Sequence, residues 1–437
     1  MFCSQTCSPA SIDVVEACMK NVAKQLFHPL VIASFVMALL LYSGIINIQS
    51  RFPYKALIAQ EAVCTLTGTI SSNPVKTKGS YYRCNIKLSS VAEESQIQSQ
   101  ASGTVSIYLP SQTVESLYPQ KLHAHLTTES QLFETGAHIC AKVRWSENTQ
   151  AFYAEDIQSV YFEKTLKGQL SYLRGKLRLT FKRLMSAWGS AGALILSLLS
   201  GAREYTDEKT SLAFRSAGLS HILALSGMHL SFFSSLAGTS IGKLFGKRHL
   251  FIPRLLAILL FVLFAGLSPS LFRALLCSLI MMISSRIFCS RMSFLHVLSA
   301  VFLIHIVVRP QDCYEIAFIL SYLSLAGILI FSDILSVVLI NAFPEKIATS
   351  LAASVGAQTA TAPVSMSVFG CITPIGIFST VIVSPLISIF LTAAIIAIVL
   401  SLCIPLCAQV MGSILNVGFC CIMFFVKLFA AFPAITL

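Results

Sequence analysis

The sequence predicts an α-helical polytopic membrane protein with about nine spans and an inserted all-β soluble domain. Three observations carry this prediction. The 437 residues are 55% hydrophobic and only 11% charged, and the mean hydropathy is +0.76, which is more apolar surface than one soluble core can bury. Apolar runs long enough to cross a bilayer recur through the second half of the chain. A polar stretch with strand-like alternation separates them from a first apolar run.

The N-terminal part divides into a cytoplasmic segment, residues 1–29, and a transmembrane anchor, residues 30–48. Lys20 and Lys24 precede the apolar run. This run is longer than the apolar core of a signal peptide, which has about 7 to 15 residues, and Tyr42-Ser43-Gly44-Ile45 is a poor cleavage site. We therefore expect the anchor to be retained.

Residues 51–163 predict a soluble all-β domain. They contain turn pairs such as Asn73-Pro74 and no run long enough to span a membrane. The regular spacing of the strand-like segments is typical of a small barrel or sandwich. These segments are Val63 to Ser71, Tyr81 to Leu88, Gly103 to Leu109, Lys121 to Thr128, Ala137 to Trp145 and Phe152 to Val160.

Residues 164–187 predict a basic amphipathic helix, since leucine and phenylalanine recur at intervals of three and four and no acidic residue is present. Two interpretations remain open. The helix lies on an anionic lipid surface, or its basic face meets a polyanion such as DNA. The candidate DNA or lipid surface comprises Lys167, Arg174, Lys176, Arg178, Lys182 and Arg183.

Residues 188–437 predict a polytopic helical domain. Ala191 to Leu199 is too short to cross a bilayer and is interpreted as interfacial or re-entrant. Lysine and arginine in the short loops fall on one side if the N-terminus is cytoplasmic, which places the β domain outside. The predicted spans are Gly218 to Ser240, Phe251 to Leu267, Leu271 to Phe288, Phe294 to Val308, Cys313 to Phe331, Ile347 to Phe369, Ile375 to Leu402 and Leu406 to Phe432.

The sequence predicts no enzyme, metal site or cofactor. A GxxxxGK phosphate-binding loop is missing, so the chain does not hydrolyse nucleotides in that way. Ser226 and His229 lack a third residue to orient them as a hydrolase pair. Three of the fourteen cysteines, Cys64, Cys84 and Cys140, lie in the predicted outer domain. Two of these three can form one disulfide there.

Four segments carry a resemblance to a known family. They are Leu219-Ser220-His221-Ile222-Leu223-Ala224-Leu225-Ser226-Gly227-Met228-His229, Ala265-Gly266-Leu267-Ser268-Pro269-Ser270-Leu271-Phe272-Arg273-Ala274, Ala317-Phe318-Ile319-Leu320-Ser321-Tyr322-Leu323-Ser324-Leu325-Ala326-Gly327 and Ala357-Gln358-Thr359-Ala360-Thr361-Ala362-Pro363. In order and spacing they resemble the signatures of ComEC-type competence proteins, the inner-membrane channels for incoming DNA. Departures occur at Ile319, Thr380 and Arg309-Pro310.

The resemblance implies an OB-like fold for the outer domain and an inner-membrane channel that moves single-stranded DNA into the bacterial cytoplasm during natural transformation. It implies partners: an ATP-driven cytoplasmic DNA translocase, an extracytoplasmic DNA receptor and a separate nuclease. Many members also carry a metallo-β-lactamase-like domain. This sequence contains no HxHxDH motif and ends at Leu437 without that domain, so its nuclease activity is not expected here.

Translocation of a polyanion needs a wet, polar path through the protein. We expect His221, Ser226, Gly227, His229 and Arg273 to border this DNA path. The alternative is that the histidines and Ser226-Gly227 serve helix packing and that Arg273 snorkels to the interface. A small-solute transporter is the alternative function.

Tyrosines of the outer domain are candidates for stacking on bases. Tyr81, Tyr82 and Tyr108 lie on predicted strands, where half-buried packing is the competing interpretation.

Overall fold

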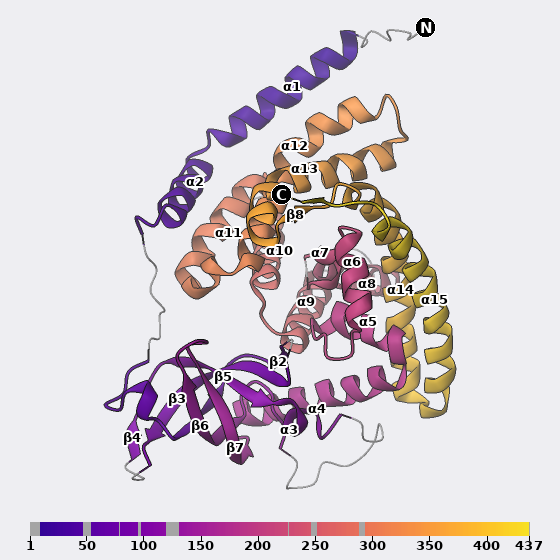
Figure 1. Cartoon of the computed structure of the whole chain (residues 1–437). Coiled ribbons are helices and arrows are strands. Elements are labelled where there is room, and N and C mark those ends of the chain that lie inside the picture. The colour runs from indigo at the N-terminus through magenta and orange to yellow at the C-terminus, as the bar shows by residue number, and fades with distance from the viewer. Residues whose placement is uncertain are drawn as a thin grey trace.

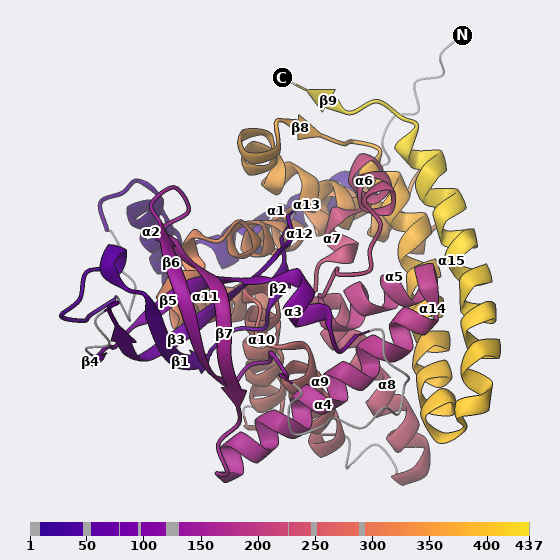
Figure 2. The same ribbon diagram turned by 60° about the horizontal axis from the view of Figure 1, so that its bottom comes forward.

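The structure is a computed structural model of the whole chain. It describes residues 9–46, 54–77, 79–94, 98–118, 131–225, 227–245, 251–287 and 293–436. Figure 1 shows a β domain at one side of a larger helical part, with helix α4 (Leu166–Ala187) running between the two. In Figure 2 the same helix extends from the β domain toward the ends of the last two helices.

The β domain is a closed ring of five strands. The ring runs β1-β3-β5-β7-β6 and returns to β1, and every pair is antiparallel except β5 with β7. Short β2 and β4 also pair with β3. The strands are β1 (Thr65–Ile70), β2 (Val75–Lys76), β3 (Tyr81–Ala92), β4 (Gln98–Gln100), β5 (Thr104–Pro110), β6 (His138–Ser146) and β7 (Ala151–Tyr161), with helix α3 (Ser111–Glu115) after β5.

The ring forms because apolar residues alternate along its strands and point inward. Leu66 and Ile70 of β1, and Tyr82 and Ile86 of β3, are at most 1% exposed. Gly68 lies at a bulge where β1 shifts register against β3, and a Cβ there would lie 2.5 Å from the Lys87 carbonyl oxygen. Five of the six predicted strands are found, whereas the sixth, Lys121 to Thr128, lies outside the described residues.

The helical part packs in layers around a buried central helix. Helix α5 is buried from Ala191 to Ser200, so it is a core helix and the interfacial interpretation is wrong. Helix α5 itself comprises Gly189–Ser200. The remaining helices are α1 (Pro9–Leu26), α2 (Pro29–Tyr42), α6 (Glu208–Ser216), α7 (Ser220–Leu223), α8 (Gly227–Phe245), α9 (Phe251–Ala265), α10 (Pro269–Ile287), α11 (Phe294–Val308), α12 (Ile316–Leu339), α13 (Glu345–Phe369), α14 (Gly376–Cys403) and α15 (Ala408–Ala430).

Fewer helices are long and apolar enough to cross a membrane than the nine expected. Among the described residues, α12, α14 and α15 qualify, and a fourth span results if α1 and α2, which meet at a 67° bend, act as one. Helices such as α9 and α11 have 15 residues. At about 1.5 Å per residue they fall short of a hydrocarbon core of roughly 30 Å.

The predicted span from Gly218 to Ser240 is not continuous. Gly218 adopts a φ of +73°, which ends α6, and the single-turn α7 follows. Helix α8 starts only at Gly227. The polar motif segment that begins at Leu219 is therefore a broken helix.

Two short strands, β8 (Cys371–Ile372) and β9 (Ile435–Thr436), pair near the end of the chain. They join the connection between α13 and α14 to the segment that follows α15.

Candidate nucleic-acid path and junction with the β domain

Arg273 lies where three of the four motif segments meet. Its Nη1 donates to the Ser321 carbonyl oxygen of α12 at 2.6 Å, and its guanidinium carbon lies 5.8 Å from the centre of the Tyr322 ring. A Cβ at Gly227 would lie 3.7 Å from Nη2 and 3.3 Å from the Ala274 side chain. The glycine therefore lets the start of α8 approach α10 closely.

The guanidinium of Arg273 is buried but incompletely paired. The residue is 8% exposed, and its Nε has no hydrogen-bond partner in the part of the chain that the structure describes. A buried cation with a free donor suits an anionic ligand. Snorkelling toward an interface does not describe a side chain in this position.

The other predicted path residues are placed differently. His221 is exposed on α7 and His229 is fully buried on α8. Ser226 lies outside the described residues. Of the predicted path residues that the structure describes, Gly227 and Arg273 lie in contact with one another.

The fourth motif segment packs against the third through small residues. A Cβ at Gly327 of α12 would lie 2.5 Å from the Ala360 side chain of α13, and one at Gly356, just before the fourth segment, would lie 2.8 Å from the Gly327 carbonyl oxygen. Glycines allow close approaches of this kind in membrane helices. Nearby, Gln358 Nε2 donates to the Thr373 carbonyl oxygen at 3.3 Å. The four segments thus form one contiguous region.

A buried polar cluster beside Arg273 was missed by the sequence reasoning. His305 of α11 lies 3.1 Å from both the Tyr322 hydroxyl and Asp312 Oδ2, and Arg309 Nη2 lies 3.2 Å from Asp312 Oδ1. His305 and Asp312 are 0% and 1% exposed. The sequence signal that could have indicated this cluster is the position of His305 and Asp312 at the edge of an apolar run, since ionisable residues there usually have a function or a partner.

Three residues of the predicted basic surface are buried instead. Arg178, Lys182 and Arg183 of α4 are 3%, 4% and 5% exposed, so the prediction of a surface role is wrong for them. Arg178 pairs with Glu134 at 3.1 Å, and Lys182 pairs with Glu204 at 2.9 Å. The helix turns this face toward two buried carboxylates, Glu134 before β6 and Glu204 between α5 and α6.

The same face of α4 binds the end of α9. Arg174 Nε donates to the Leu263 carbonyl oxygen at 2.5 Å, and Arg178 Nη1 donates to that of Phe264. Asn73, after β1, donates to the Ala265 carbonyl oxygen at 3.2 Å. The last carbonyls of a helix lack partners within the helix and attract cations. The β domain, α4 and the apolar helix α9 therefore form one junction.

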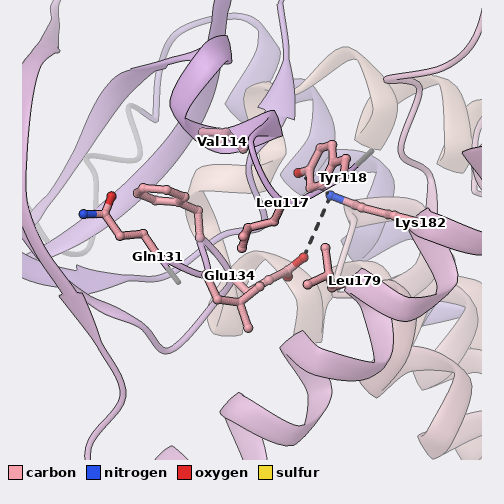
Figure 3. Close-up of a pocket in the computed structure, with 9 residues that line it drawn as sticks. Val114, Leu117, Tyr118, Gln131, Glu134, Leu179 and Lys182 are labelled. Atoms are coloured by element: carbon pink, nitrogen blue, oxygen red, sulfur yellow. Dashed lines mark hydrogen bonds and ion pairs between the residues drawn. The ribbon is translucent and has the colours of Figure 1, made fainter. Parts of the chain in front are cut away.

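A small cavity at this junction holds Lys182 and Tyr118. Figure 3 shows Lys182 pointing between Tyr118 and Glu134, and its Nζ lies 2.9 Å from the Tyr118 hydroxyl. Burial acts to lower the pKa of Lys182, but Tyr118, Glu204 and Glu134 raise it above the usual value, so the ammonium stays charged. The cavity volume open to the centre of a water molecule is about 10 Å³. This is room for about one water and not for a nucleotide.

The opposite face of α4 is exposed and apolar. Leu166, Leu170, Leu173 and Leu177 are 88%, 53%, 52% and 56% exposed. Lys167 and Lys176 are exposed as well, and Arg174 is half-buried. The helix therefore presents leucines outward with lysines beside them, and it directs most of its arginines inward.

The β domain carries tyrosines on its surface and free thiols. Tyr81 is 38% exposed, whereas Tyr82 is fully buried and donates to Glu115 at 2.8 Å; Tyr82 is therefore not available for stacking. Cys64, Cys84 and Cys140 are free in the structure. Burial raises the pKa of the Cys84 thiol to about 12. Within the described ranges, no three His, Cys, Asp or Glu residues gather as metal ligands would.

Comparison with known proteins agrees with the motif segments. The family model described as "Competence protein" matches residues 198–437, more than half of the chain, and this region contains all four segments. No curated protein and no solved structure matches the chain. The chain therefore belongs to the competence protein family, of the ComEC type.

Proposed function

We propose that this protein conducts single-stranded DNA across the bacterial inner membrane into the cytoplasm during natural transformation. The observation that carries the proposal is the buried Arg273, with an unpaired Nε, at the meeting point of Gly227 and the Ser321 segment. A cation is costly inside apolar helices, so it is usually retained there for a ligand or an ion path. Phosphate is an anion that a guanidinium binds well.

We also propose how the chain is arranged in the membrane. The protein is a multi-pass membrane protein with about nine spans, and its β domain faces the extracytoplasmic side. This domain is of OB type, which is supported by the five-strand ring with its parallel β5–β7 pair and by helix α3 between β5 and β6. Each shorter helix crosses the membrane together with a neighbouring helix and not alone.

The chain acts as a conduit and not as an enzyme. We propose that the energy for transport and the degradation of the second strand come from other proteins. We propose an ATP-driven DNA translocase on the cytoplasmic side, a DNA receptor outside and a separate nuclease.

Helix α4 lies in the outer surface of the membrane. Its exposed leucine row would be covered by acyl chains, and Lys167 and Lys176 would meet lipid phosphates, as in other amphipathic interfacial helices. Its inward arginines tie the β domain to α9 at this level. Contacts with lipid and with protein therefore both fix the distance of the β domain from the membrane.

Uptake of labelled DNA by cells that carry Arg273→Ala tests the conduit. We expect DNA entry to be lost at a normal protein level, and Arg273→Lys to restore part of it because the charge remains. Lys209→Ala, which removes an exposed cation of α6, is the matched control and should leave DNA entry unchanged. Normal DNA entry in the Arg273→Ala cells would contradict the role of Arg273.

A small-solute transporter is a second candidate, favoured by two observations. The motif segment breaks between α7 and α8, and several apolar helices are short, as in transporters with discontinuous helices around a compact site. A transporter should leave DNA entry unchanged in every one of these variants, whereas a DNA conduit should not.

A further inference from the structure

A row of two tyrosines between two arginines crosses four neighbouring strands of the β domain. In the register of the sheet, Arg83 of β3 lies opposite Tyr108 of β5, Tyr108 lies opposite Tyr153 of β7, and Tyr153 lies opposite Arg144 of β6. Directly opposed residues point to the same side of a sheet. These four side chains therefore form one continuous row on the outer surface, here called the Arg–Tyr row.

The aromatic part of the row is already stacked. The rings of Tyr108 and Tyr153 lie 4.7 Å apart with an angle of 11° between their planes. Tyr81 stands edge-on to both, at 6.5 Å and 5.3 Å. Tyr81 is exposed, and Tyr108 and Tyr153 are half-buried. The three rings thus make a preformed platform, and binding to it requires little reordering.

The arginines at both ends are reachable by a ligand. Arg83 is exposed and donates from Nη2 to the Ser106 hydroxyl at 3.2 Å. The Arg144 side chain is 78% exposed and lies 3.5 Å from Glu155, whose side chain is 59% exposed. An exposed ion pair of this kind is weak, so a phosphate group can replace Glu155.

The charge of Arg83, at one end of the Arg–Tyr row, reaches the start of α12. Burial and Asp312 raise the pKa of Glu315, the residue before α12, while Arg309 and Arg83 act in the opposite direction. The same helix carries Ser321, whose carbonyl oxygen accepts a hydrogen bond from Arg273.

We propose that the Arg–Tyr row, with Tyr81 beside it, binds unpaired DNA. Bases stack on the tyrosine rings, and the two arginines bind phosphates of the same strand. Duplex DNA fits poorly because its bases are already stacked on one another and offer no free faces. This inference rests on the proposed function and adds the place where the incoming strand is first held.

Binding of a labelled thymidine strand of about 12 nucleotides, within the roughly 4 to 16 nucleotides that one OB-type domain covers, tests the row. The purified full chain in detergent micelles is titrated and fluorescence anisotropy is recorded. Tyr108→Ala and Tyr153→Ala should each weaken binding roughly 5- to 150-fold, the loss of one stacked base. Tyr153→Phe should bind as the unaltered protein does, since the ring remains.

The matched control is Tyr161→Ala. Tyr161 is on the same strand as Tyr153 and is 54% exposed, but it stacks on His138 away from the row. Its loss should leave affinity unchanged. Each arginine tested separately, as Arg83→Ala or Arg144→Ala, should reduce the slope of log affinity against log salt by about 0.7, the value for one phosphate contact on a single strand.

Unchanged affinity in the two tyrosine-to-alanine variants, equal affinity for duplex and single strand, or an unchanged salt slope would overturn the proposal. The DNA-uptake assay separates this outcome from failure of the proposed function. If the row variants bind normally while Arg273→Ala still abolishes uptake, the row is wrong and the conduit stands. If the tyrosine variants lose binding and uptake falls with it, the row and the conduit are both supported.

Discussion

His305 Nε2 lies 3.1 Å from Asp312 Oδ2, and Nδ1 of the same ring lies 3.1 Å from the Tyr322 hydroxyl. An ionised Asp312 only accepts hydrogen bonds, so Nε2 donates to it. The remaining Nδ1 then accepts the proton of Tyr322. One neutral tautomer of His305 satisfies both contacts, and Arg309 balances the charge of the carboxylate at 3.2 Å. The cluster therefore fixes α11, the following turn and α12 to one another.

Replacing Asp312 by alanine should destabilise this part of the protein strongly. The change leaves buried His305 and the charge of Arg309 without their acceptor, and loss of one partner of a buried pair costs roughly 3–5 kcal/mol. Thermal unfolding of the detergent-solubilised protein measures the loss. Asp312→Asn keeps an acceptor for His305, so its melting temperature should lie between those of the unaltered protein and Asp312→Ala. Asp333→Ala removes an exposed carboxylate of α12 and should change nothing; equal melting of all variants would contradict the account.

Replacing Gly356 by alanine should loosen the contact between α12 and α13. The new Cβ would lie 2.8 Å from the Gly327 carbonyl oxygen and 3.3 Å from the Phe331 side chain. The helices must therefore move apart, which costs about 1–3 kcal/mol. The amount of folded protein after heating should fall. Gly79→Ala is the control because no atom lies within 4 Å of the added group, and a drop of the same size there would show that the effect is not one of packing.

Replacing Arg178 by alanine should detach the β domain from the helical part. It leaves Glu134 without its partner at 3.1 Å and removes the donor to the last turn of α9. Lys182 is 4.0 Å from Glu134 and compensates in part, so we expect a cost near the lower end of roughly 3–5 kcal/mol.

Limited proteolysis between the β domain and α9 measures this detachment. Arg178→Lys should not restore resistance, because an ammonium does not reproduce the spread of guanidinium donors. Lys176→Ala, two residues away and exposed, should be cleaved like the unaltered protein. Resistance unchanged in Arg178→Ala would show that the junction is held elsewhere.

The helices and strands were largely predictable because their signals are local. Strands β3, β5, β6 and β7 lie where alternation placed them, and α9 to α15 overlap the predicted spans. Span number was not predictable in the same way, because an apolar run does not reveal where its helix begins. The run from Gly218 contains enough apolar residues to span, but the positive φ of Gly218 and the start of α8 at Gly227 break it.

The candidate site was predictable only in part. Arg273 and Gly227 were found because they lie in motif segments, whereas their contact depends on how closely α8 packs against α10. The direction of the basic face of α4 was not predictable, because the carboxylates that attract it, Glu134 and Glu204, lie far away in the sequence. The Arg–Tyr row depends on strand register, which pairs Tyr153 with Tyr108 across a parallel ladder.

Acid should weaken the β domain through Glu115. The carboxylate of Glu115 lies 2.7 Å from Lys76 Nζ and accepts the Tyr82 hydroxyl proton at 2.8 Å. Burial acts to raise the pKa of Glu115, but these two hydrogen bonds outweigh it and hold the pKa below the usual 4.5. The unfolded chain then binds the proton more readily than the folded one. The stabilisation is therefore complete above about pH 4.5 and is lost as the pH falls through the lower folded pKa.

Glu115→Gln isolates this contribution, because all other carboxylates titrate alike in the two proteins. The difference in melting temperature between the unaltered protein and Glu115→Gln should be greatest near neutral pH. It should shrink as the pH falls below about 4.5. Glu147→Gln, at an exposed site in the turn before β7, should show no such dependence. A difference for Glu115→Gln that stays constant with pH would mean that the carboxylate has the same proton affinity in both states, and the hydrogen bonds to Lys76 and Tyr82 would then not stabilise its charge.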